Sequence, residues 1–217
     1  MKHLFHKSSI IICVAGMMLA GVGQAGIIYQ ALPNQSGATD MNAAIVADSF
    51  ILANPITVQN IRFWSLQGGL SDYTGSIEWS INSDSSGLPG TSLGSGLATP
   101  TGIVTGLSGF GLNEFSYSWA VSVALNAGTY WVELHNGPSS AVPATSFFWG
   151  WNNANAGNGQ TQDIAPQTQP WIAQSASLAL QLDGAVSAVP EPGTVMLGAV
   201  GLLGTMLIRA RRVRRAR

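Results

Sequence analysis

Hydrophobic and polar residues alternate along much of the middle of the chain, a pattern typical of half-buried β-strands. The clearest run covers residues 113–123. Its large apolar residues share one face: Phe115, Tyr117, Trp119, Val121 and Val123. Residues 76–82 and 177–182 repeat the pattern, with Ile77, Trp79 and Ile81 facing inward in the first of these runs. Each run therefore predicts one strand with a buried face and a solvated face.

Further strands are predicted in five shorter segments, which gives about eight in all. These segments are residues 47–52, 57–65, 103–107, 129–135 and 147–151. Asn, Gly, Pro and Ser dominate the connections, and no segment has the period of an amphipathic helix. We therefore expect an all-β domain over residues 26–184, an antiparallel β-sandwich of jelly-roll type, with a β-barrel as the alternative.

The first 25 residues have the organisation of a secretory signal peptide. Two lysines precede an apolar run over residues 10–22, and small residues follow it, so we expect cleavage between Ala25 and Gly26. A buried N-terminal helix is the alternative, but a polar, Gly-rich stretch follows the run at once. Cys13, the only cysteine, lies in this segment, so the mature chain has neither a disulfide nor a cysteine metal site.

The C-terminal end predicts a membrane anchor. A linker over residues 185–193 contains Pro190, Glu191 and Pro192, and an apolar segment over residues 194–208 follows it. Fifteen helical residues span about 22 Å, less than the roughly 30 Å hydrocarbon core, so this transmembrane helix is short. The tail over residues 209–217 is basic, and its arginines are Arg209, Arg211, Arg212, Arg214, Arg215 and Arg217. Basic flanks stay in the cytoplasm, which places the C-terminus inside and the β domain outside.

The order of these features resembles the PEP-CTERM sorting signal of Gram-negative bacteria. Pro190, Glu191 and Pro192, the short apolar helix and the Arg cluster carry the resemblance, over about the last 30 residues. It implies recognition and processing at the Pro-Glu-Pro by exosortase, a membrane enzyme of bacteria that make exopolysaccharide. An ordinary single-pass anchor is the alternative.

The β domain resembles the exported bacterial β-sandwich domains found ahead of such tails. The segments that carry this resemblance are residues 47–52, 61–64, 87–90, 127–132 and 148–151. It implies a fold and no defined activity.

Charge is sparse and unevenly placed. Only 9% of the residues are charged, against about 25% in an average protein. Residues 26–188 contain a single basic residue, Arg62, and nine acidic residues, which gives this part a net charge of −8. Binding of nucleic acid is excluded for this part, because contacts to phosphates need Lys and Arg.

Catalytic groups are hard to find in the sequence. His135 is the only histidine after the signal peptide, which excludes a multi-histidine metal site. Ser92 lies in a G-x-S-x-G pattern that would make it a nucleophile with His135 as its base, but we expect a loop there. The acids are spread over the segments, and we expect each to be a surface charge. Eight of the nine are Asp48, Asp72, Glu78, Asp84, Glu114, Glu133, Asp163 and Asp183. We predict no catalytic residue and no enzyme.

Two segments suggest binding. Residues 82–87 have the oxygen-ligand spacing of the first half of a calcium loop, although a hairpin turn also explains them. Trp149, Trp151 and Trp171 flank a segment rich in Asn, Gln and Gly, which suits sugar rings, although tryptophans of this kind also fill cores. Apart from calcium, no cofactor is expected.

The sequence therefore predicts an exported, non-enzymatic protein of the cell surface or extracellular matrix, sorted by exosortase and associated with exopolysaccharide or biofilm. A carbohydrate-binding module and a glycoside hydrolase that uses two carboxylates are the alternatives.

Overall fold

The computed structural model describes residues 25–156, 159–163, 170–174 and 176–186, which form two antiparallel β-sheets. The eight strands of the first sheet are β1 (Gly26–Ala31), β2 (Ala38–Asp40), β4 (Ile56–Gln67), β7 (Ile103–Gly109), β8 (Leu112–Leu125), β10 (Phe147–Ala156), β13 (Ala176–Leu178) and β14 (Leu180–Val186). The six strands of the second sheet are β3 (Ala44–Leu52), β5 (Ile77–Asp84), β6 (Pro89–Ala98), β9 (Gly128–Asn136), β11 (Gln160–Asp163) and β12 (Ile172–Ala173). A short 3₁₀ turn, η1 (Leu70–Asp72), follows β4.

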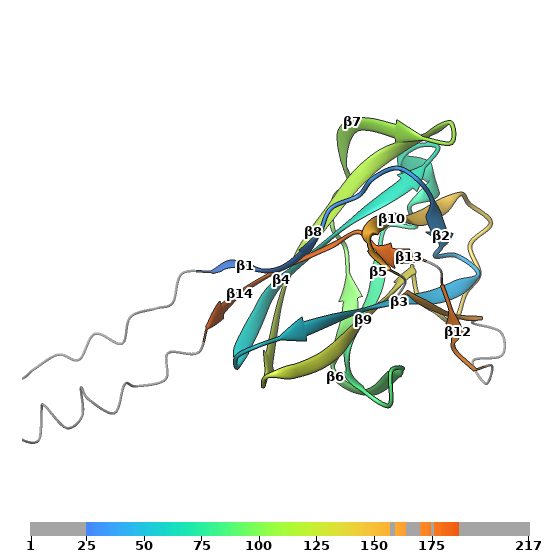
Figure 1. The fold of residues 1–217 in the computed structure, drawn as a ribbon. Coiled ribbons are helices and arrows are strands. Elements are labelled where there is room, and N and C mark those ends of the chain that lie inside the picture. Colours follow the sequence, from blue (N-terminus) through green and yellow to red (C-terminus); the bar gives the residue numbers. More distant parts are fainter. Residues whose placement is uncertain (1–24, 157–158, 164–169, 175, 187–217) are drawn as a thin grey trace, which may run out of the picture. The chain divides into compact units, whose positions relative to one another are not determined.

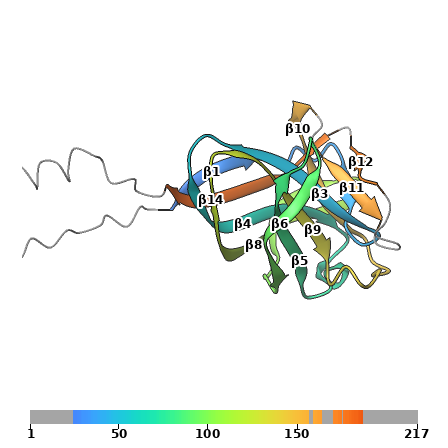
Figure 2. The same cartoon turned by 90° about the horizontal axis from the view of Figure 1, so that it is seen from below.

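Strand β4 is the centre of the first sheet (Figure 1). It pairs with β8 along almost its whole length, and on its other side with β14 and then β10. The second sheet has the order β12-β11-β3-β9-β5-β6, and Figure 2 shows β3, β9, β5 and β6 crossing the domain together. Within the described residues, β7 and β6 are edge strands, each paired on one side only. They follow each other in the sequence but belong to different sheets.

The core lies between the two sheets, because the period-two pattern turns one face of each strand inward. Ile77, Ile81, Phe50 and Val132 come from the second sheet, and each is buried. They form one cluster with residues of the first sheet: Val58, Ile61, Phe63, Phe115, Tyr117, Trp119, Phe147, Trp149, Leu180 and Leu182. The rings of Phe63 and Tyr117 stack at 5.4 Å between centroids. The all-β, sandwich-like prediction is confirmed, and the jelly-roll connectivity stays a prediction.

The predicted strands are present, and five further strands were not predicted: β1, β2, β6, β11 and β12. The run over residues 177–182 is divided at Ala179 between β13 and β14. There the Ala179 amide donates to the Gly150 carbonyl at 2.7 Å, while its carbonyl accepts from Trp149 Nε1 at 2.7 Å. Strand β14 ends at Val186, so the first two residues of the predicted linker belong to the sheet.

The expectation that every acid is a surface charge is wrong for Asp48 and Glu114. Asp48 is fully buried on the inner face of β3 and accepts hydrogen bonds from the amides of Ser49 and Leu178. Leu178 belongs to the other sheet, so this carboxylate joins the two layers. Glu114 is 2% exposed and accepts from Gln35 and Thr105. Buried carboxylates persist where such donors satisfy their oxygens.

The predicted signal peptide and its cleavage position, the Pro-Glu-Pro motif, the apolar segment and the Arg cluster lie outside the described residues, apart from Ala25 and Gly26. In the part of the chain that is described, no helix has the length and apolar character needed to cross a membrane.

Candidate functional site

The three tryptophans predicted to bind glycans do not share one exposed surface. Trp149 is fully buried in the core and donates from Nε1 to the Ala179 carbonyl, so its predicted binding role is wrong. Trp151, two residues further along β10, and Trp171, just before β12, are half-buried. Among the described residues, Trp151 lines a hollow that could accept a ligand.

That hollow, which we call the aromatic hollow, has a volume of about 430 Å³. Its lining includes Gly37, Leu66, Phe110, Leu112, Phe148 and Trp151. These residues come from the segment before β2, from β4, from the β7–β8 hairpin and from β10, so the fold brings together positions far apart in the sequence. Ligand sites in proteins commonly have a volume of about 300–1,000 Å³ and a mostly apolar lining, as here.

Trp151 is held firmly on one side of the aromatic hollow. Its Nε1 donates to Thr39 Oγ1 at 2.8 Å, and its amide donates to the Gly37 carbonyl at 3.0 Å. A Cβ atom on Gly37 would lie 2.3 Å from the indole Cε3, so residue 37 has to be glycine for the chain to pass this close to the ring.

Phe110 also lines the aromatic hollow and lies at the tip of the β7–β8 hairpin. Its side chain is 73% exposed and its φ is +54°, a left-handed conformation that bulky residues rarely adopt. Gln35, across from the hairpin, is also left-handed at +55°. Phe110 and Gly111, whose φ is +77°, are the two residues of the tight turn between Gly109 and Leu112, and positive φ at both positions is the geometry of a type I′ hairpin turn. An exposed aromatic ring beside a hollow, at a turn position that favours glycine or asparagine, is a candidate binding residue.

Buried Glu114 connects the segment before β2 to the β7–β8 hairpin. One carboxylate oxygen accepts from Gln35 Nε2 at 2.5 Å, and the other accepts from Thr105 Oγ1 at 2.8 Å. Gln35 lies in the segment before β2, while Thr105 and Glu114 belong to the hairpin strands. Both oxygens are thus engaged within the protein, and none of the residues that line the hollow is charged.

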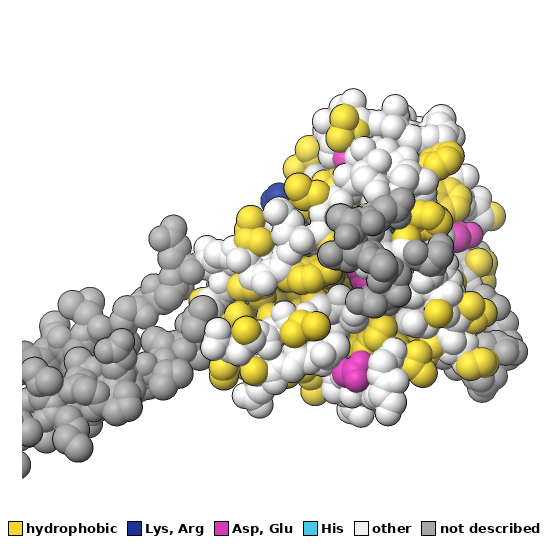
Figure 3. Space-filling model, viewed as in Figure 1, with side chains coloured by type: hydrophobic (Ala, Val, Ile, Leu, Met, Phe, Trp, Pro, Cys, Tyr) yellow, Lys and Arg dark blue, Asp and Glu magenta, His cyan; other side chains and the backbone are white. Residues whose placement is uncertain are grey.

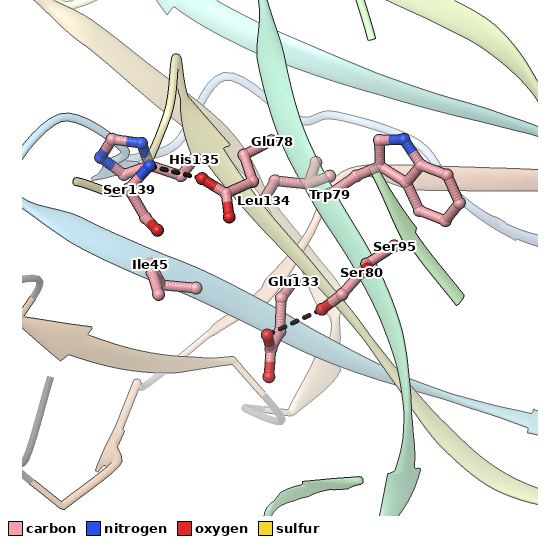
Figure 4. Close-up of a pocket in the computed structure, with 9 residues that line it drawn as sticks. All are labelled: Ile45, Glu78, Trp79, Ser80, Ser95, Glu133, Leu134, His135 and Ser139. Atoms are coloured by element: carbon pink, nitrogen blue, oxygen red, sulfur yellow. Dashed lines mark hydrogen bonds between the residues drawn. The ribbon is translucent and has the colours of Figure 1, made fainter. Parts of the chain in front are cut away.

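A second, smaller cavity lies on the outer face of the second sheet and brings two acids together (Figure 4). Glu78 on β5 and Glu133 on β9 line it, and Ser80 Oγ donates to Glu133 Oε2 at 2.8 Å. The Ser139 amide donates to Glu78. Burial raises the pKa of Glu133, an effect that the Ser80 hydrogen bond opposes and the nearby charge of Glu78 reinforces.

The volume of this cavity argues against hydrolysis of a glycoside there. It is about 60 Å³, well below the roughly 300–1,000 Å³ of common ligand sites. Local spacing could not pair these two acids, because they meet only when β5 and β9 are neighbours.

Ser92 and His135 do not form a nucleophile and base. They lie on opposite sides of β5, where Ser92 pairs with Asn82 and His135 with Glu78, four residues or about 13 Å apart along the strand. The ring of His135 is buried, with Nδ1 2.9 Å from the Gly137 carbonyl and Nε2 3.1 Å from the Asn42 carbonyl. A base needs a lone pair that faces its substrate, and both nitrogens face these carbonyls.

The predicted half calcium loop is the end of the β5–β6 hairpin. Asp84 Oδ1 accepts from Trp131 Nε1 at 2.9 Å, and Oδ2 accepts from the Gly87 amide at 3.1 Å. Ser86 and Gly87 have positive φ values of 58° and 82°, as in the tight turns of hairpins. Among the described residues, no group of three or more His, Cys, Asp or Glu side chains could hold a metal ion.

Comparison with known proteins places one motif on this chain. The family model of the PEP-CTERM protein-sorting motif matches residues 188–212, which include Pro190, Glu191 and Pro192 and the first basic residues of the tail. The resemblance found in the sequence is thereby confirmed for this segment. No curated protein and no solved structure matches the chain.

Proposed function

We propose that this protein, which carries a PEP-CTERM sorting motif at residues 188–212, is cut by exosortase at the motif and delivered to the cell surface or the extracellular matrix. The motif carries the proposal, since it implies export, a membrane-anchored precursor and exosortase as the processing partner. The predicted signal peptide, the anchor over residues 194–208 and the basic tail fit that route.

We infer that the exported domain is not an enzyme. Two arrangements that could have supported catalysis are unsuitable: Ser92 and His135 lie apart, and the cavity at Glu78 and Glu133 is too small for a sugar ring. Association with exopolysaccharide is part of the same proposal. It is supported by the sparse charge of the domain, because few charged side chains would lose water when an uncharged polysaccharide covers the surface.

The test of sorting is the intact mass and the cell fraction of the protein, in the host and in a strain that lacks exosortase. We expect a form that begins at Gly26 and ends near residues 190–192 outside the cell, only when exosortase is present. Glu191→Ala should prevent its formation, whereas Ser187→Ala, three residues before the motif, should not. A full-length, membrane-bound protein in both strains would show that the segment is an ordinary anchor.

A carbohydrate-binding module is the second candidate function, and it is compatible with the first. The observation that favours it is the aromatic hollow, which Trp151 and Phe110 both line. Trp149 has no part in it, because its ring lies in the core.

A further inference from the structure

The aromatic hollow presents aromatic side chains to a ligand and no charge. Phe110, Phe148 and Trp151 line it, and the remaining lining is aliphatic, glycine or small and polar. On the face shown in Figure 3, hydrophobic side chains lie over the β7–β8 hairpin and around β2, and acidic side chains are scattered between them. An anionic ligand would find no cation here, since Arg62 is the only basic residue between positions 26 and 188. The ligand that fits is uncharged.

The chemistry of the rings narrows the ligand class further. An aromatic face attracts the weakly positive C–H groups on the flat side of a sugar ring, while the hydroxyls at the edge of that ring stay in water. An acyl chain has no such edge, so in a hollow that opens to solvent much of its length would stay exposed to water. The ring of Phe110 is 73% exposed, so a ligand that contacts it stays partly in water, as a sugar does.

The hollow is also formed before any ligand binds. Gly37 and Thr39 hold the indole of Trp151, and Glu114 ties the hairpin of Phe110 to Gln35. The backbone at Phe110 keeps a left-handed conformation at φ +54° that a glycine would adopt at no steric cost. An aromatic residue at this turn position lowers stability relative to glycine and, at 73% exposure, gains little from burial, so the fold itself does not require the ring.

We propose that the aromatic hollow binds a strand of uncharged polysaccharide, with Phe110 and Trp151 contacting the flat faces of its sugar units. This inference rests on the carbohydrate-binding candidate above and gives it a site and a ligand class. Binding requires neither processing by exosortase nor release from the membrane, so the two proposals fail separately.

The test uses the full-length protein in lipid nanodiscs, without detergent, which could itself fill an apolar hollow. Titration calorimetry measures the binding of neutral hexasaccharides of glucose, mannose, galactose and xylose, and of an anionic oligouronate. We expect at least one neutral hexasaccharide to bind and the oligouronate not to bind.

The informative variant is Phe110→Gly. Removal of the ring should weaken binding about tenfold, which corresponds to the loss of one aromatic contact of about 1.4 kcal/mol. Glycine also relieves the left-handed backbone, so the thermal midpoint should rise by about 2 to 4 °C. A change with a merely structural effect would not lower affinity and raise stability together. Leu107→Ala is the matched control, since Leu107 is 53% exposed on the same hairpin but does not line the hollow.

Three results would overturn the proposal. One is that no neutral hexasaccharide binds at millimolar concentration. Another is that Phe110→Gly binds like the unmodified protein, or that Leu107→Ala loses as much affinity. The third is binding of a fatty acid in the same nanodiscs, lost on Phe110→Gly, while none of the sugars binds. This last result would assign the hollow to an acyl chain.

Discussion

Asp48 should make this protein less stable as the pH rises. Its carboxyl group is fully buried between the sheets, and no basic side chain is bonded to it. Burial raises the pKa of Asp48 from 3.8 to about 7, against the opposing effect of the hydrogen bonds from the Leu178 and Ser49 amides. Tyr29, whose pKa is raised to about 12 by burial and then by Asp48, is the titratable side chain that faces it from β1.

The sign and the size of the effect follow from this difference in pKa. Between pH 3.8 and about 7 the folded state keeps a proton on Asp48 that the unfolded state has lost, so the free energy of unfolding falls as the pH rises through this window. Above about pH 7 the free energy of unfolding is lowered by the full cost of the ionised, buried Asp48 carboxylate. Below pH 3.8 this cost is absent, because Asp48 is protonated in both states. Three pH units at 1.36 kcal/mol each give a total of about 4 kcal/mol, of which about 2 to 3 kcal/mol lie between pH 5 and pH 8. Glu133, whose pKa is also raised by burial, acts in the same direction.

Urea unfolding followed by tryptophan fluorescence at pH 5, 6, 7 and 8 measures this slope. Asp48→Asn should remove most of it and raise the stability at pH 8 by less than the full 4 kcal/mol. The gain is smaller because the new amide has one oxygen for two backbone donors, and an unsatisfied donor costs about 1–3 kcal/mol. Asp40→Asn, at an exposed aspartate, is the control and should leave the slope in place. A stability that is flat or rises from pH 5 to pH 8 in the unmodified protein would refute the reasoning.

Three further predictions concern packing and topology. Asn136→Ala should destabilise the fold by about 2 to 4 kcal/mol in urea, because this buried side chain bonds Asp72 in η1, Thr74 after that turn and Asn42 between β2 and β3. Gly37→Ala should lower the thermal midpoint strongly, since its Cβ would overlap the ring of Trp151; Gly26→Ala meets nothing within 4 Å and should have little effect. Replacement of the arginines in residues 209–217 by glutamine should allow protease to reach the C-terminus from outside in whole cells, and continued protection would contradict the predicted orientation.

Of the five strands that the sequence did not predict, four lie at an edge of the described sheets, namely β1, β2, β6 and β12. Ile77 and Ile81 alternate with polar residues because β5 has a buried face along its length. Strand β6 has no such pattern, since its inward positions include Gly94 and Gly96. Val123 and Trp79 fill the space where their side chains would lie, so glycine is needed for a tertiary reason that local patterns do not contain.

Asp48 and the aromatic hollow differ in how far the sequence could have predicted them. The period-two pattern itself placed Asp48 on the inner face with Val46 and Phe50, so this position could have been predicted had the alternation been given more weight than the charge. The hollow gave no such signal. Its lining comes from segments near residues 37, 110 and 151, which are about 75 and 40 residues apart along the chain, and the positive φ of Phe110 belongs to the two-residue turn between β7 and β8.

The pairing of the first strand with the last has a consequence for the order of events during synthesis and export. Strand β14 lies between β1 and β4 and carries Leu180 and Leu182 into the core. The ribosome synthesises β14 about 150 residues after β1. Until then β1 and β4 each have an unpaired edge, and the core lacks the side chains of β14. Such long-range pairing forms slowly. The unfinished domain is therefore a loose chain, the form that can pass through a membrane pore, and folding is completed only when the segment just before the sorting motif has emerged.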